Sequence, residues 1–221
     1  MRLNIAATPA SASELATNKV LRNTYMLLSM TLLFSALCAG LAMMLNMPPL
    51  GMVVTMIGYF GLLFATHKFS RSALGLVLVF ALTGFMGLTL GPIINMYLSA
   101  YANGAELVMT ALGGTGLIFI ALSAYALTTR KNFNFLGGFL MVGVLVAFLA
   151  GIGAIVFAIP ALSLAVSAMF ILLMSGLILY ETSEIIHGGE TNYILATVSL
   201  YVSIYNLFLS LLQLLGALDG E

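Results

Sequence analysis

The sequence predicts an all-α, polytopic membrane protein with seven transmembrane helices. Of its 221 residues, 62% are hydrophobic and only 6% are charged. Soluble domains carry about 25% charged residues, because a surface that faces water needs them. A chain with so few charges cannot cover itself with polar surface, so lipid must surround most of it.

Seven stretches are long and apolar enough to cross a bilayer, which needs about 20 mostly apolar residues for each helix. In lipid every stretch must satisfy its own backbone hydrogen bonds, so we expect all seven to be helical. A segment of residues 1–23 precedes this transmembrane domain (24–216), and residues 217–221 follow it. The expected spans are 24–45, 50–66, 73–98, 105–128, 135–158, 161–181 and 192–216.

The basic residues predict the orientation. All of them lie before the first span, between the second and third spans, or between the fourth and fifth. In a seven-span arrangement these places share one side, which the positive-inside rule assigns to the cytoplasm. The N-terminus is then inside and the C-terminus outside, whereas six spans with a re-entrant segment would place both ends inside. The residues concerned are Arg2, Lys19, Arg22, Lys68, Arg71, Arg130 and Lys131.

Composition also narrows the function. Seven Lys/Arg balance seven Asp/Glu, which gives no electrostatic case for nucleic acid. The single cysteine, Cys38, leaves no disulfide framework and no cysteine-based metal site. The last span has no Lys for a retinal Schiff base, and no span holds a His or Lys to activate a serine. We therefore expect no catalytic site, no cofactor and no enzyme activity.

The last span carries a regular polar pattern, the polar stripe. Spacings of four, three, four and three place its members on one helix face, which should turn into the bundle rather than toward lipid. We expect this helix to be central. Hydrogen bonds between helices would explain the stripe, and the lining of a pathway is the alternative. The stripe consists of Ser199, Ser203, Asn206, Ser210 and Gln213.

Small residues and one proline mark the third span. Gly87 and Gly91 form a GxxxG pattern, which lets two helix backbones approach closely. Pro92 follows Gly91, removes a backbone donor and clashes with the preceding turn. We therefore expect a kink at Gly91 and Pro92.

Glu181 is the most informative single residue. It lies near the expected cytoplasmic end of the sixth span, and its helix should continue to a cap at Gly188. An unpaired carboxylate in lipid is costly, so Glu181 should pair with a cation or take up a proton. Lys68 is the preferred partner, with Arg71 and Arg130 as competitors. The simpler interpretation is an interfacial glutamate that reaches water.

Glu184 and His187 have the i, i+3 spacing of a metal-ligand pair. Bundle metal sites need such pairs from two helices together with further carboxylates. This chain has one copy of the pair, and His67 is its only other histidine. We therefore predict no metal site.

Several segments resemble the Bax-inhibitor (TMBIM) family of seven-helix membrane proteins. The most specific is the run YETSEIIHGGETNY at residues 180–193. The others are residues 19–25, 90–95, 123–131 and 135–138. Together they extend over nearly the whole chain, and they are most similar to the bacterial branch that modulates the membrane protease FtsH.

This resemblance implies a regulator in the cell inner membrane that associates with FtsH and modulates degradation of membrane proteins. Other family members behave as pH-sensitive Ca²⁺ leaks, which gives the alternative function, with Ca²⁺ or H⁺ as the ligand. Those members use two interacting aspartates on the sixth and seventh helices and a basic residue from the second. By position these correspond to Glu181, Ser203 and Lys68, so the second acid is missing here. Glu181 with Ser203 and Asn206 makes a thin cation site, because Ca²⁺ favours several oxygen ligands.

Overall fold

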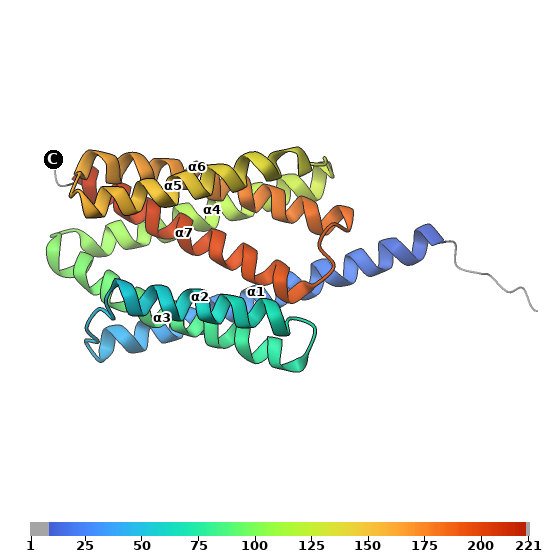
Figure 1. Ribbon diagram of the computed structural model, residues 1–221, viewed down its shortest axis with the longest axis horizontal. Helices are drawn as coiled ribbons and strands as arrows, with labels where there is room; N and C mark the ends of the chain where they lie inside the picture. The colour runs from blue at the N-terminus through green and yellow to red at the C-terminus, as the bar shows by residue number, and fades with distance from the viewer. Residues whose placement is uncertain (1–8, 220–221) are drawn as a thin grey trace, which may run out of the picture.

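The computed structural model describes residues 9–219, and within this range the chain is helical and contains no strand (Figure 1). Seven helices are long and apolar enough to cross a membrane, which confirms the predicted fold class. Which side each end faces stays a prediction, and Arg2 lies outside the described residues. The elements are α1 (Pro9–Met44), α2 (Met52–Phe69), α3 (Ala73–Ala100), α4 (Gly104–Thr129), η1 (Asn134–Leu136), α5 (Gly137–Val156), α6 (Pro160–His187) and α7 (Tyr193–Asp219).

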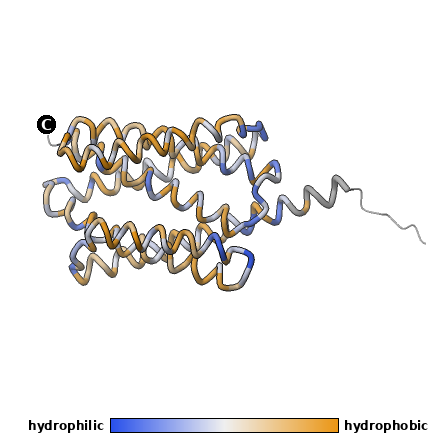
Figure 2. Tube along the Cα trace, viewed as in Figure 1, coloured by the Kyte–Doolittle hydropathy of each residue, from blue (hydrophilic) through white to orange (hydrophobic). Residues whose placement is uncertain are grey.

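The helices form two groups with α7 between them. Helices α1, α2 and α3 make one group, helices α4, α5 and α6 make the other, and α7 runs obliquely between the two (Figure 1). Accordingly α7 packs against α1, α3, α4 and α6, whereas α2 packs chiefly against α3. Hydrophobic residues line the helices along their length, and hydrophilic residues gather at the helix ends and connections (Figure 2).

Local sequence explains where the helices begin and end. Pro160 occupies the first turn of α6, where its missing N–H costs nothing. Gly188 ends α6 in the left-handed conformation, with φ 75°, as the sequence predicts. The first helix begins at Pro9 and passes through Lys19 and Arg22 without a break, so it starts well before the expected residue 24 and extends beyond the rest of the bundle (Figure 1).

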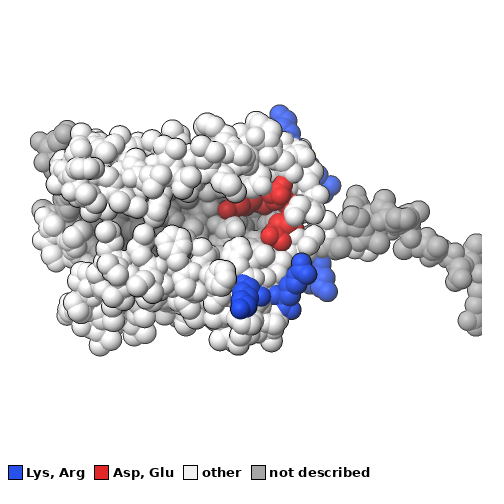
Figure 3. All heavy atoms as spheres, viewed as in Figure 1, with Lys and Arg blue, Asp and Glu red and all other residues white. Residues whose placement is uncertain are grey.

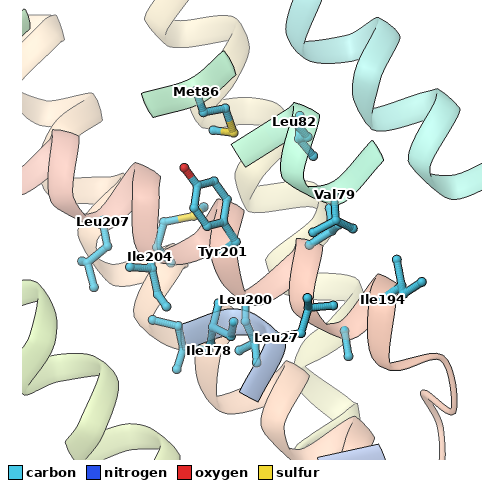
Figure 4. Packing of buried hydrophobic residues seen from close by; sticks show 14 of the residues in the cluster. Leu27, Val79, Leu82, Met86, Ile178, Ile194, Leu200, Tyr201, Ile204 and Leu207 are labelled. Atoms are coloured by element: carbon cyan, nitrogen blue, oxygen red, sulfur yellow. The ribbon is translucent and has the colours of Figure 1, made fainter. Parts of the chain in front are cut away.

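The centre of the bundle lies around Tyr201 of α7, whose side chain is 1% exposed. Its ring points toward α3 among aliphatic side chains from several helices (Figure 4). Its hydroxyl donates to the carbonyl oxygen of Thr83 on α3 at 3.3 Å and lies 2.6 Å from the Ser35 hydroxyl on α1. A single buried hydroxyl therefore links three helices.

Glycine allows α3 and α1 to approach closely, as the GxxxG pattern predicts. A Cβ at Gly87 would collide with the backbone oxygen of Ser35. A Cβ at Gly91 would lie 2.6 Å from the Ala42 Cβ and 2.7 Å from the Ala39 carbonyl oxygen. The helix α3 continues through the buried Pro92, and the kink expected there stays a prediction.

We predict that Gly91→Ala destabilises the protein by about 1–3 kcal/mol, because the added methyl group meets backbone that cannot move aside. Gly113→Ala on α4 is the matched control, since a Cβ there meets nothing within 4 Å. Thermal unfolding in detergent measures both variants. Equal unfolding midpoints for the two would contradict the assigned α1–α3 contact.

Candidate functional site

Glu181 and Ser203 come together where α6 packs against α7. The Ser203 hydroxyl lies 3.3 Å from Oε1 and 3.2 Å from Oε2 of Glu181, so it can donate to either oxygen. Ser203 is 1% exposed and Glu181 is partly buried. Ser203 on α7 thus supplies a hydroxyl donor to the Glu181 carboxylate on α6.

Lys68 does not complete this site. Among the described residues, no ion pair joins Glu181 to Lys68, Arg71 or Arg130. The Lys68 side chain is exposed at the end of α2, and its Nζ lies over the Phe69 ring, 5.8 Å from the ring centroid. Helix α2 packs chiefly against α3 and has no comparable interface with α6. The predicted cation partner of Glu181 is therefore not found.

A small pocket of about 150 Å³ opens beside Glu181. Two further carboxylates line it, from Glu184 on α6 and Glu190 on the turn that follows. Glu190 Oε1 accepts from the Asn192 backbone N–H at 2.6 Å, whereas Glu184 Oε1 is buried without a hydrogen-bond partner in the described structure. The remaining lining residues are Tyr180, Gly189, Ala196 and Ser199.

Acidic and basic side chains occupy different parts of the surface at the end of the bundle where the Glu181 pocket opens. Acidic side chains gather in one patch, and Lys and Arg lie at the edges of the same end (Figure 3). A wider, open pocket of about 520 Å³ adjoins the α2–α3 and α6–α7 connections, and Glu190 lines this pocket as well. The two connections are joined by a hydrogen bond from Asn192 Nδ2 to the Ser70 carbonyl oxygen, at 3.1 Å.

The polar stripe of α7 meets α6 at two separate places. Ser203 contacts Glu181 near one end. Near the other, Gln213 Nε2 lies 2.6 Å from the Ser163 hydroxyl, and Ser167 donates to Gln213 Oε1 at 2.8 Å. Of the other members, Ser199 lines the small pocket, Ser210 is buried, and Asn206 Nδ2 donates to the Val202 carbonyl oxygen of its own helix at 2.8 Å.

No group of three or more metal-binding side chains occurs among the described residues. The two ring nitrogens of His187 instead face backbone carbonyl oxygens, those of Ser183 at 2.9 Å and Arg130 at 3.1 Å.

The sequence did not predict that Glu190 lines the small pocket. This position depends on the turn at Gly188 and Gly189, which brings Glu190 back beside α6. The available signal was its place in the motif at residues 180–193.

Comparison with known proteins identifies the family. The family model described as "Inhibitor of apoptosis-promoting Bax1" matches residues 17–220. The chain belongs to the Bax-inhibitor family. Its seven apolar helices make it a multi-pass membrane protein of that family.

Several bacterial relatives match almost from end to end. The chain is 53% identical to the Modulator of FtsH protease YccA of Escherichia coli K12, over 96% of each chain. It is equally similar to a protein of E. coli O6:H1 named Inner membrane protein YccA. It is also 44% identical to a membrane protein of Vibrio cholerae, over 97% of this chain and 96% of the other.

We predict that Ser203→Ala destabilises the bundle by about 1 kcal/mol, because Glu181 loses its hydroxyl donor inside the protein. Ser175→Ala is the matched control, because the Ser175 hydroxyl on α6 bonds only to the carbonyl oxygen of Ile171 in its own helix. Unfolding midpoints in detergent provide the comparison. If the control loses as much stability as Ser203→Ala, the α6–α7 contact does not stabilise the fold.

Proposed function

We propose that this chain is an inner-membrane regulator that associates with the FtsH protease and modulates its degradation of membrane proteins, without catalysing a reaction of its own. The observation that carries the proposal is the 53% identity to the E. coli modulator over 96% of both chains. Similarity on this scale extends over the whole transmembrane domain rather than one motif. The name of the second E. coli relative supports the inner membrane as the location.

The first helix supports this proposal from the structure. Its membrane-crossing part begins at Thr17, so the turns from Pro9 onward precede the span. This part of α1 extends beyond the bundle (Figure 1), and Leu15 within it is 70% exposed. In the predicted orientation it lies in the cytoplasm, where an ATP-driven protease could reach it.

We expect the purified protein to bind FtsH and to slow FtsH degradation of a membrane substrate. Replacing residues 2–16 with a glycine–serine segment of equal length should weaken binding if the side chains are recognised. Deleting the same residues should weaken binding whether FtsH recognises the side chains or needs only the length of the segment. Co-purification and degradation in proteoliposomes are the measurements. A protein that neither retains FtsH nor changes the degradation rate contradicts the proposal.

A cation leak is the second candidate, and the carboxylate-lined pocket beside Glu181 favours it. Three glutamates line this pocket, and negative charge there favours the approach of a cation, although the three do not form a group that could hold a metal ion. Because Ser203 stands where other family members have a second acid, this site carries less negative charge than a pair of acids would. This activity is compatible with regulation of FtsH, and it needs a separate measurement.

If the leak operates, Ca²⁺ flux into liposomes should fall with Glu181→Gln, because the pocket loses a charge while the hydrogen bond from Ser203 is kept. Glu106→Gln, at the exposed first turn of α4, is the control. Flux is measured at about pH 6 and about pH 8, the range over which proton-sensitive sites respond. Equal flux from wild type and Glu181→Gln at both values would remove Glu181 from any ion pathway.

A further inference from the structure

The connection between α4 and α5 is held against the last turn of α6 by side-chain hydrogen bonds. The Phe133 backbone N–H donates to the Ser183 hydroxyl at 3.0 Å, and that hydroxyl donates to the Lys131 carbonyl oxygen at 3.3 Å. His187 Nε2 lies 3.1 Å from the Arg130 carbonyl oxygen. Two side chains of α6 therefore hold three residues of the connection, namely Arg130, Lys131 and Phe133.

His187 faces carbonyl oxygens with both of its ring nitrogens. Nδ1 lies 2.9 Å from the Ser183 carbonyl oxygen, and Nε2 faces Arg130. A carbonyl oxygen only accepts hydrogen bonds, so both contacts are hydrogen bonds only when both nitrogens carry protons. The arrangement thus suits the imidazolium cation, whereas a neutral imidazole leaves one nitrogen lone pair against an oxygen.

Ser183 offers the neutral ring a different partner. Its hydroxyl lies 3.3 Å from Nδ1, so it can donate there when the ring keeps its proton on Nε2. A hydroxyl has one proton to donate. When Ser183 donates to Nδ1, it no longer donates to the Lys131 carbonyl oxygen. Loss of one proton from His187 therefore removes one of the bonds that hold the connection.

Charged residues of both signs lie close to His187. They include Arg130, whose carbonyl oxygen it contacts, Lys131 on the same connection, and Glu184, one turn earlier on α6. His187 is exposed, so its proton exchanges directly with water. Helices η1 and α5 carry no ionisable side chain. The remaining ionisable groups of the adjoining elements are Glu106 and Tyr125 on α4, Tyr180 and Glu181 on α6, and Glu190 on the turn that follows α6.

We infer that protonation of His187 controls how firmly the α4–α5 connection is held against the end of α6. The protonated ring and Ser183 together donate to Arg130 and Lys131, and the connection is held closed. The neutral ring diverts the Ser183 hydroxyl, and the connection opens more often. This device needs no bound partner.

Limited proteolysis tests the inference within a single molecule. Trypsin cleaves after Arg130 and Lys131 on this connection. It also cleaves after Arg71 on the α2–α3 connection, which serves as the internal reference. The ratio of the two cleavage rates cancels the effect of pH on trypsin itself. Between about pH 5.5 and about pH 8, where histidine ordinarily changes charge, the ratio should rise about five-fold, the effect of losing one hydrogen bond from a local opening equilibrium.

Three variants separate the contributions. His187→Gln should give a ratio that no longer changes with pH, because an amide does not titrate in this range. His67→Gln, which alters the other histidine, at the exposed end of α2, should keep the wild-type dependence. Ser183→Ala should raise cleavage after Arg130 and Lys131 at both pH values.

The wild-type ratio can overturn the inference even if a variant fails to fold. A ratio that is constant with pH overturns it, as does a full pH dependence in His187→Gln. Selective ¹⁵N labelling of histidine gives an independent reading, because the chain has only two histidines. The His187 signals should change from two protonated nitrogens to one over the same pH range in which the ratio rises, and no change in those signals overturns the inference.

Discussion

Lipid gives the helices of this protein no hydrophobic reason to associate, so the bundle depends on close backbone approach and on hydrogen bonds between helices. Gly87 and Gly91 supply the close approach of α3 to α1. The Tyr201 hydroxyl, beside Ser35 and bonded to the Thr83 carbonyl oxygen, adds α7 to the same pair. Two glycines and one hydroxyl therefore contribute to the α1–α3–α7 contact, together with side-chain hydrogen bonds of Thr89, Asn95 and Thr197.

The position of α6 follows from that of α7. Ser203 contacts Glu181 near one end of the interface, and Gln213 contacts Ser163 and Ser167 near the other. Contacts at two places fix both the rotation and the register of one helix along the other. The last turn of α6 is thereby placed beside the pocket on one side and the α4–α5 connection on the other. The polar stripe thus does more than hold two helices together, because it also determines which groups meet at the end of the bundle.

Sequence reasoning predicted the helices well because each span must satisfy its own backbone in lipid. It also predicted that α6 continues past Glu181 to Gly188, where a left-handed cap ends it. It left the N-terminal part of α1 open, because the capping-box spacing of Ser11 and Glu14 indicates a short helix toward Arg22 whereas the polar composition favours a solvated tail. In the structure α1 is continuous through Lys19 and Arg22. The hydropathy of the sequence indicates where the membrane-spanning part of a helix begins, but the helix itself can begin earlier in the chain.

The candidate site was only partly predictable for a different reason. Periodicity identifies the residues that share a helix face, and resemblance paired Glu181 with Ser203, which the structure brings together. Neither gives distances between distant helices, so neither could show that the Lys68 side chain lies over the Phe69 ring and forms no ion pair with Glu181 among the described residues. Glu190 was missed because its position depends on the turn between α6 and α7. Such a turn leaves no periodic signal.

The hydroxyl of Ser203 in place of a second acid changes what the site can do with protons. Two facing carboxyl groups repel when both are charged, so they share a proton and respond to pH as a pair. A serine hydroxyl does not titrate, and it donates to Glu181 whether or not another charge is near. The Glu181–Ser203 contact therefore cannot act as a proton-sharing pair. His187, at the same end of α6, offers a different origin for a pH response, because both of its ring nitrogens face carbonyl oxygens.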